Sequence, residues 1–196
     1  MSDGTPSRDA GSPAGRSVIR GIFRLARFKP EGFVEFTASR QAFLNSLAPL
    51  IAFPLVGWLL MMMGGAGIGA FTDLLVTVVA LLAPPVISAS LARILGREAA
   101  WLRYAVAFNW CQWAVPLAAV LVLLVMGIMT RLGLTEVQAA IGALFGIAGY
   151  GLSLHWFLAR HGLALSRGLA VLFVVLLNVG TITLVMLPHL VIRLLG

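Results

Sequence analysis

Three amide side chains and one imidazole lie well inside apolar stretches of this sequence, where they can form hydrogen bonds or bind a proton. They are Asn109, Gln112, His155 and Asn178. Because exposing such groups to hydrocarbon is costly, we expect each to face other helices and to find a partner there. Together they could form a polar pocket or a relay. The sequence favours ordinary hydrogen bonding between helices, worth about 0.6 kcal/mol per contact, because no carboxylate lies at mid-depth to complete a relay.

Metal binding and catalysis have no matching pattern. His155 and His161 are six residues apart, His189 is distant from both, and Cys111 is the only cysteine, so no metal-ligand spacing is present. The sequence contains no nucleophile elbow, zinc-protease motif, phosphate-binding loop or paired carboxylates. We therefore expect no catalytic residues, no metal and no cofactor, and a protein that is not an enzyme.

Asp73 is the one acidic residue close to an apolar stretch. It precedes most of the second predicted span, on the side that also holds Arg131 and Arg193. An ion pair with either arginine would ease partial burial of the carboxylate. The alternative is an interfacial carboxylate surrounded by water and headgroups.

Small residues follow one face of the fourth predicted span. Gly142 and Gly146 form a G-x-x-x-G pair, and Gly149 and Ser153 continue the pattern. Small side chains let helix backbones approach closely. We expect this face to pack within the helix bundle, with a homo-oligomer interface as the alternative.

Composition shows what must position these residues. Of 196 residues, 60% are hydrophobic and 11% are charged, whereas soluble domains have about 25% charged residues. A membrane-spanning helix needs about 20 mostly apolar residues. The sequence predicts an all-α, polytopic membrane protein with five spans, at residues 42–63, 70–92, 104–129, 137–158 and 168–192, so that residues 42–196 form one membrane domain. Pro84 and Pro85 are expected to interrupt the hydrogen bonds of the second span.

The amino-terminal region divides into two parts. Residues 1–15 are polar and rich in Gly, Ser and Pro, which predicts a disordered tail. Residues 16–41 form a basic amphipathic segment. Its first helix carries four arginines within one quadrant and apolar residues on the opposite side: Arg16, Arg20, Arg24 and Arg27. This pattern is typical of a helix that lies at the membrane interface with arginines towards anionic headgroups, or of one packed on the protein itself.

A second helix is expected to begin at Pro30. It would place Phe33, Phe36, Phe43 and Leu47 on one face and lead into the first span.

Basic residues also indicate orientation. Twelve of the 14 Lys and Arg residues lie on one side of the predicted spans, and only Arg131 and Arg193 lie on the other. Since cytoplasmic segments carry the excess of positive charge, the amino terminus is predicted to be cytoplasmic and the carboxyl terminus periplasmic, in a bacterial inner membrane. The net charge of +7 therefore indicates contact with anionic headgroups rather than with nucleic acid.

Two short stretches, taken together with this layout, resemble a known family. The segment RFKPEGFVEF, residues 27–36, enters the first span, and Gly149-Tyr150-Gly151 lies in the fourth. With five spans and a short outer carboxyl terminus, the chain resembles the Yip family of Ypt/Rab-interacting membrane proteins, in particular its bacterial relatives, from about Arg20 to the end. The resemblance implies a non-enzymatic membrane protein that acts on membrane shape or on partner proteins. The Asp-Leu-Tyr-Gly-Pro motif of the eukaryotic branch is absent, so GTPase-linked trafficking is not implied.

The expected function is thus a structural role, or an interaction with lipids or proteins, in the membrane. Its partners would be anionic lipids on the cytoplasmic side and either another protein or a second copy of the chain. The alternative is a small transporter or channel component that uses the four polar residues named first.

Overall fold

The computed structural model describes residues 13–65 and 67–195, with side chains at 17–65, 67 and 69–187. Its elements, in chain order, are α1 (Pro13–Ala26), the short 3-10 helix η1 (Pro30–Glu35), α2 (Arg40–Met63), α3 (Ile68–Ile94), α4 (Glu98–Cys111), α5 (Ala114–Arg131), α6 (Glu136–Gly162) and α7 (Arg167–Leu195). Within the described residues, five helical stretches are long and apolar enough to cross a membrane, with α4 and α5 together making the third. The predicted all-α fold with five spans is confirmed.

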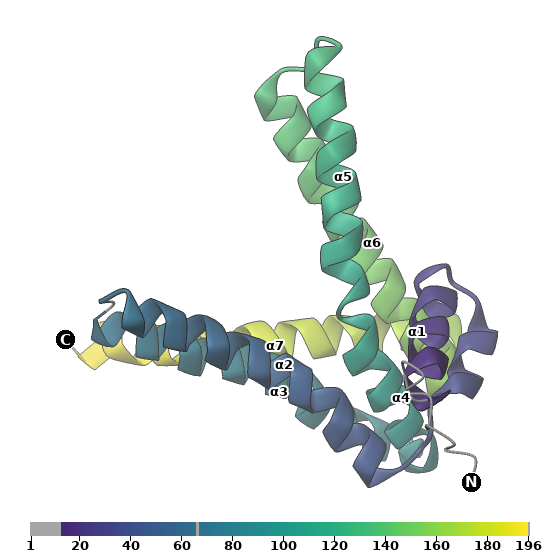
Figure 1. Ribbon diagram of the computed structural model, residues 1–196. Helices are drawn as coiled ribbons and strands as arrows, with labels where there is room; N and C mark the ends of the chain where they lie inside the picture. The colour runs from purple at the N-terminus through teal and green to yellow at the C-terminus, as the bar shows by residue number, and fades with distance from the viewer. Residues whose placement is uncertain (1–12, 66, 196) are drawn as a thin grey trace, which may run out of the picture.

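Two arms diverge from a common region of the molecule (Figure 1). The helix α3 packs along both α2 and α7, and the three form the three-helix arm, while α5 and the first half of α6 form the hairpin arm. Large apolar side chains on the arms are exposed, such as Leu124 at 61% and Phe145 at 73%. Surfaces of this kind are expected to face lipid.

The common region is the best-packed part of the fold. We call it the junction: α1, η1, α4 and the last turns of α6, residues 150–162. Every residue of α4 from Tyr104 to Asn109 is buried, as expected of a helix surrounded by others. Its aromatic side chains point into the core. There the Tyr104 ring contacts Phe173 of α7 edge-on, with 5.7 Å between ring centroids. The junction therefore holds the start of both arms together.

The helix α1 packs on the protein itself. It begins at Pro13 rather than at the predicted Arg16, and proline is favoured at a first helical position. Leu25 is fully buried in the junction core, and Val18 and Ile22 pack against the same core. The rest of the predicted disordered tail, residues 1–12, lies outside the described residues.

The expected second helix from Pro30 to the first span is wrong. Its first part is η1, which ends at Glu35, and α2 begins at Arg40 after a break, with the Ser39 hydroxyl accepting a hydrogen bond from the Ala42 amide. Close packing explains the short helix, because η1 touches α1 backbone to backbone: a Cβ at Gly32 would lie 2.9 Å from the Gly21 carbonyl oxygen. Phe33 and Phe36 are buried between α1 and the rest of the junction.

A helix is interrupted beside Pro116 and not, as expected, at Pro84 and Pro85. The helix α3 continues from Ile68 to Ile94 through Pro84 and Pro85, whereas the predicted span 104–129 is interrupted after Cys111, and α5 begins at Ala114. Pro116 accounts for this break, because it has no N–H for the carbonyl of Gln112 and its ring would clash with that carbonyl in a continuous helix.

Candidate functional sites

Asn109 joins two helices through a buried hydrogen bond. Its Nδ2 donates to Oγ of Ser46 on α2 at 3.0 Å, and the Ser46 hydroxyl donates to the Phe43 carbonyl at 2.7 Å. Asn109 is 1% exposed and Ser46 is 0% exposed. Buried polar groups are stable only when paired, so this contact fixes the position of α4 against α2.

His155 and Asn178 of the predicted polar cluster lie elsewhere. The His155 ring contacts Phe108, with 4.9 Å between centroids, and its Nδ1 is buried without a hydrogen-bond partner among the described residues. Asn178 Nδ2 donates to the Val174 carbonyl of its own helix at 2.8 Å. Phe108 and Asn109 are adjacent on α4, so their side chains point about 100° apart. His155 therefore contacts a different face of α4 from the one that carries Asn109.

Gln112 does share a site with Asn109. Both line a cavity of about 450 Å³ between α2, α3 and the break that separates α4 from α5. Leu50 and Leu81 line it too, and each is near the middle of its helix. Beside the cavity the ring of Trp113 packs on Phe53, with 4.9 Å between centroids. The structure thus brings two of the four predicted polar residues to one cavity.

The arginines of α1, together with Arg27 directly after it, form an outward face, as the helical spacing predicts. Arg20 and Arg27 are exposed, and the Arg27 guanidinium lies 5.9 Å from the centroid of the Phe23 ring. Arg24 is paired with Glu35 of η1 at 3.0 Å. The Arg16 side chain lies outside the described residues. Two arginines of this face are therefore free of the carboxylate that holds Arg24.

An apolar groove adjoins this face. It has a volume of about 460 Å³ and lies between α1 and α5, with Arg27 and Tyr150 among its lining residues and Leu117 and Leu121 along α5. Beside it Phe23 is 54% exposed. The groove places an apolar wall directly next to an exposed cation.

The predicted small-residue face divides into two halves. A Cβ at Gly142 would lie 3.0 Å from Met126 Sδ, and one at Gly146 would lie 3.2 Å from Val122 Cγ1, so both glycines pack against α5. Gly149 has nothing within 4 Å of its Cβ position, and Ser153 is exposed. The first half builds the hairpin arm, and the second half is open.

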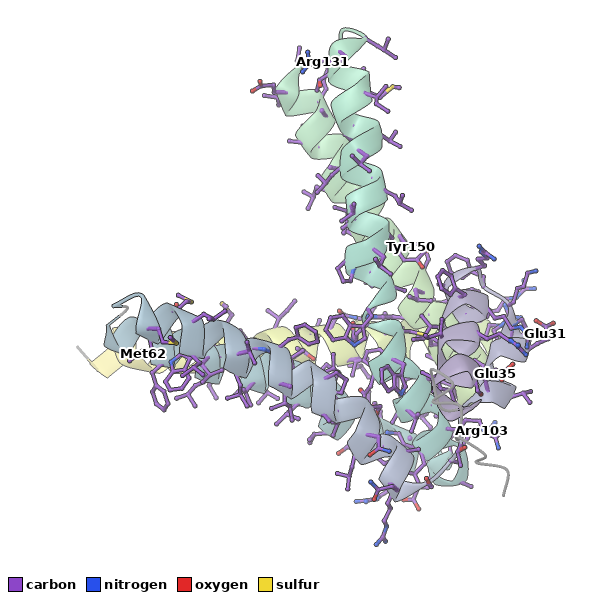
Figure 2. The ribbon with its side chains drawn as sticks, in the orientation of Figure 1. Glu31, Glu35, Met62, Arg103, Arg131 and Tyr150 are labelled. Atoms are coloured by element: carbon purple, nitrogen blue, oxygen red, sulfur yellow. The ribbon has the colours of Figure 1, made fainter. Side chains whose placement is uncertain are left out.

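The predicted ion pair between Asp73 and Arg131 does not form. Figure 2 shows Arg131 at the far end of the hairpin arm and Met62 near the far end of the three-helix arm, where α3 begins. Asp73 lies in the first turns of α3 and is exposed, so the divergence of the arms separates it from Arg131. The Arg193 side chain lies outside the described residues, and its pairing with Asp73 stays a prediction.

Comparisons with models of known protein families, with characterised proteins and with solved structures give no match to this chain. Within the described residues, no group of three or more His, Cys, Asp or Glu side chains could hold a metal ion.

Sequence reasoning missed the residues that hold α1 in place. The Tyr150 hydroxyl donates to the Ala26 carbonyl at 3.0 Å, and the Phe28 ring meets the rings of Tyr150 and Phe157 edge-on. Glu35 binds both Ser17 and Arg24. The available signal was the presence of two glutamates, Glu31 and Glu35, within a basic segment, since an acidic side chain there has cations close at hand.

Proposed function

We propose that this chain is a non-enzymatic, multi-pass protein of a bacterial inner membrane, with a structural or interaction role that depends on anionic lipids at its cytoplasmic surface. In this proposal the junction lies at the cytoplasmic side and the ends of both arms at the periplasmic side. The observation that carries it is the fixed orientation of α1. Its buried face is part of the junction core, so its arginine face must point outward.

The charges on α1 set the strength of the proposed lipid contact. Each Lys or Arg near an anionic membrane surface contributes about 1 kcal/mol. Arg24 contributes less because Glu35 neutralises it at 3.0 Å. Arg20 and Arg27 therefore carry most of the attraction expected from the amino-terminal arginines whose side chains the structure describes.

The groove between α1 and α5 supports the same role. An acyl chain that follows Leu117 and Leu121 would run along α5, while its headgroup phosphate would lie near Arg27. Exposed Ile19 and Phe23 would then be in the acyl region, with the arginines in the headgroup layer.

The Yip resemblance supports an interaction role in this proposal. The two stretches that carry it, residues 27–36 and 149–151, meet in the structure through Phe28 and Tyr150. A protein partner or a second copy would bind in addition to lipid, and the open half of the α6 small-residue face is available to it.

Lipid retention tests the proposal. Purified protein would be mixed with equal amounts of phosphatidylglycerol and phosphatidylcholine in detergent, and bound lipids counted by native mass spectrometry. The double variant Arg20→Gln/Arg27→Gln should lose a measurable part of the preference for phosphatidylglycerol, since each cation near the surface contributes about 1 kcal/mol. The matched control is Arg131→Gln, an exposed arginine at the far end of an arm, which should keep it. Equal retention by all three proteins would contradict the proposal.

One observation favours a second candidate, a small transporter or channel component. The cavity beside Gln112 adjoins a break in a membrane-spanning helix, and such breaks line substrate sites in several transporter folds. Flux of small ions and solutes into vesicles that contain the purified protein would test it.

A further inference from the structure

The turn between α6 and α7 holds two arginines beside one tryptophan ring. The Arg160 guanidinium lies 5.3 Å from the centroid of the Trp156 ring, and the indole N–H of Trp156 donates to the backbone carbonyl of Arg167 at 3.3 Å. One ring thus contacts an arginine near the end of α6 and the first residue of α7. The turn connects the helix of the hairpin arm to a helix of the three-helix arm (Figure 1).

Buried leucines hold this turn in place. Leu163 and Leu165 are 0% and 6% exposed and belong to the junction core, and the Leu165 amide donates to the Arg160 carbonyl at 3.0 Å. Ala164 lies between them in the left-handed conformation at φ 51, so the chain changes direction within a few residues. Both arginines are therefore carried by a backbone that the core fixes.

Neither arginine is neutralised by a carboxylate among the described side chains. The ion pairs in that part of the chain join Arg24 to Glu35 and Arg93 to Glu98. Arg167 is exposed, and Arg160 is half-buried beside the indole. Two cations without a described counter-charge thus extend from residues that contact the same ring.

Apolar side chains continue from this turn into the predicted membrane. Leu152 lies one turn before Trp156 on α6 and is 51% exposed, and Val171 lies one turn after Arg167 on α7 and is 53% exposed. Residues four apart share one face of a helix. Tryptophan is favoured at the boundary between headgroups and acyl chains, so the arginines would lie on its polar side and the two apolar residues on its acyl side.

We propose that this turn binds one anionic phospholipid, with the phosphate at Arg160 and Arg167 and an acyl chain along Leu152 and Val171. Guanidinium groups form paired, charge-assisted hydrogen bonds to phosphate oxygens. A zwitterionic lipid fits less well, because its own cation would lie close to two arginines. The apolar surface that begins one turn deeper favours a lipid over a soluble phosphate.

This site is separate from the arginine face of α1. It shares with the proposed function only the placement of the junction in a lipid headgroup layer, and none of its residues belongs to α1 or lines the groove beside α1. The experiment therefore observes Trp156 itself, so that loss of lipid at α1 and loss of lipid at this turn give different results.

The experiment is quenching of Trp156 fluorescence by lipids with brominated acyl chains. The full chain in an uncharged detergent is titrated with brominated phosphatidylglycerol or brominated phosphatidylcholine. Titration of the Trp156→Phe protein gives the signal of the other four tryptophans, which is subtracted. Phosphatidylglycerol should quench Trp156 at a roughly 10-fold lower concentration than phosphatidylcholine, as expected of two cations near an anionic headgroup.

Charge variants identify the site, each measured with Trp156 and with Phe at that position. Arg160→Gln/Arg167→Gln should abolish most of the preference for phosphatidylglycerol. Arg97→Gln/Arg103→Gln is the matched control, because it removes two exposed arginines from the same side of the predicted spans, and it should keep the preference.

Two results would overturn the inference. One is equal quenching of Trp156 by the two lipids in the wild-type protein, and the other is an equal loss of preference in the two double variants. If Arg160→Gln/Arg167→Gln does not fold, Arg167→Gln decides alone, since that side chain is exposed. It should reduce the preference by roughly 3-fold, and no reduction would equally count against the site.

The proposed function can fail independently of this site. Arg20→Gln/Arg27→Gln should leave the quenching of Trp156 unchanged. If that variant also retains phosphatidylglycerol as the wild type does, the role of α1 is contradicted and the site at the α6–α7 turn stands. If it removes the preference at Trp156, the turn is not a separate site and the inference is overturned.

Discussion

The Tyr150 hydroxyl donates a hydrogen bond to the Ala26 carbonyl at 3.0 Å, although the two residues are 124 positions apart in the chain. Ala26 is the last residue of α1, and the final carbonyls of a helix have no partner within it. Phe28 follows in the left-handed conformation at φ 58 and turns its ring towards Tyr150. One aromatic residue of α6 thus caps α1 and packs on the turn that follows it (Figure 2).

Replacing Tyr150 with Phe should loosen α1 while leaving the arms intact. The ring contact with Phe28 remains, and only the hydrogen bond is lost, at a cost of about 0.5–1.5 kcal/mol. Hydrogen exchange of residues 18–26 should speed up by roughly 3- to 10-fold at that cost, while exchange in α3 and α7 should not change. Unchanged exchange in α1 would show that the bond does not hold the helix.

Replacing Tyr104 with Phe, unlike replacing Tyr150, should not lower the stability of the protein. The Tyr104 hydroxyl is buried in the junction and has no hydrogen-bond partner among the described residues. Its removal takes away an unsatisfied polar group, so we expect no loss of stability, or a gain of about 1 kcal/mol. The melting temperature in detergent measures this, and a clear loss would indicate a partner for the hydroxyl, such as a buried water.

Replacing Gly162 with Ala should destabilise the junction. The added Cβ would lie 2.9 Å from the Phe33 ring and 3.1 Å from the Tyr104 ring, and overpacking of this kind costs about 1–3 kcal/mol. Gly57→Ala is the matched control, because its Cβ would meet nothing within 4 Å and alanine favours helix by about 1 kcal/mol over glycine. The two variants should shift the melting temperature in opposite directions, and a shared direction would argue against close packing at Gly162.

Replacing Ala164 with Gly should stabilise the protein. Ala164 follows the end of α6 at φ 51, where glycine carries no steric penalty, and its side chain is exposed. We expect a gain of about 0.5–1 kcal/mol, measured by thermal or denaturant unfolding. Ala148→Gly makes the same chemical change at an exposed site inside α6. It should lower the stability by about as much as Ala164→Gly raises it. A loss at Ala164 would exclude the left-handed conformation there.

The spans could be predicted from sequence because length and apolar content define them. All five predicted ranges overlap the observed helices, with ends that differ by a few residues. The break at Gln112 could not be predicted as easily, since prolines also occur inside α2 and α3 without interrupting either helix. What distinguishes Pro116 is its place in the first turn of α5, where the chain leaves the junction after α4 and continues into the hairpin arm.

The sequence predicted the faces on which the candidate site residues lie, but not the partners that they contact. Helical spacing alone placed the arginines of α1 on one face. The partners of those residues came from distant parts of the chain, as Ser46 does for Asn109 and Tyr150 for Ala26. Contacts between helices depend on how the arms diverge, and no local pattern in the sequence encodes that angle.

The distance in sequence between Ala26 and Tyr150 also sets an order of events during synthesis. At about 5–20 residues per second, a ribosome needs roughly 6–25 s to make the chain between them. For that time α1 exists without the helix that caps it. Under the proposed function, its apolar side would then have the bilayer surface as its available partner, and the nascent protein would meet lipid through the side that the finished protein buries.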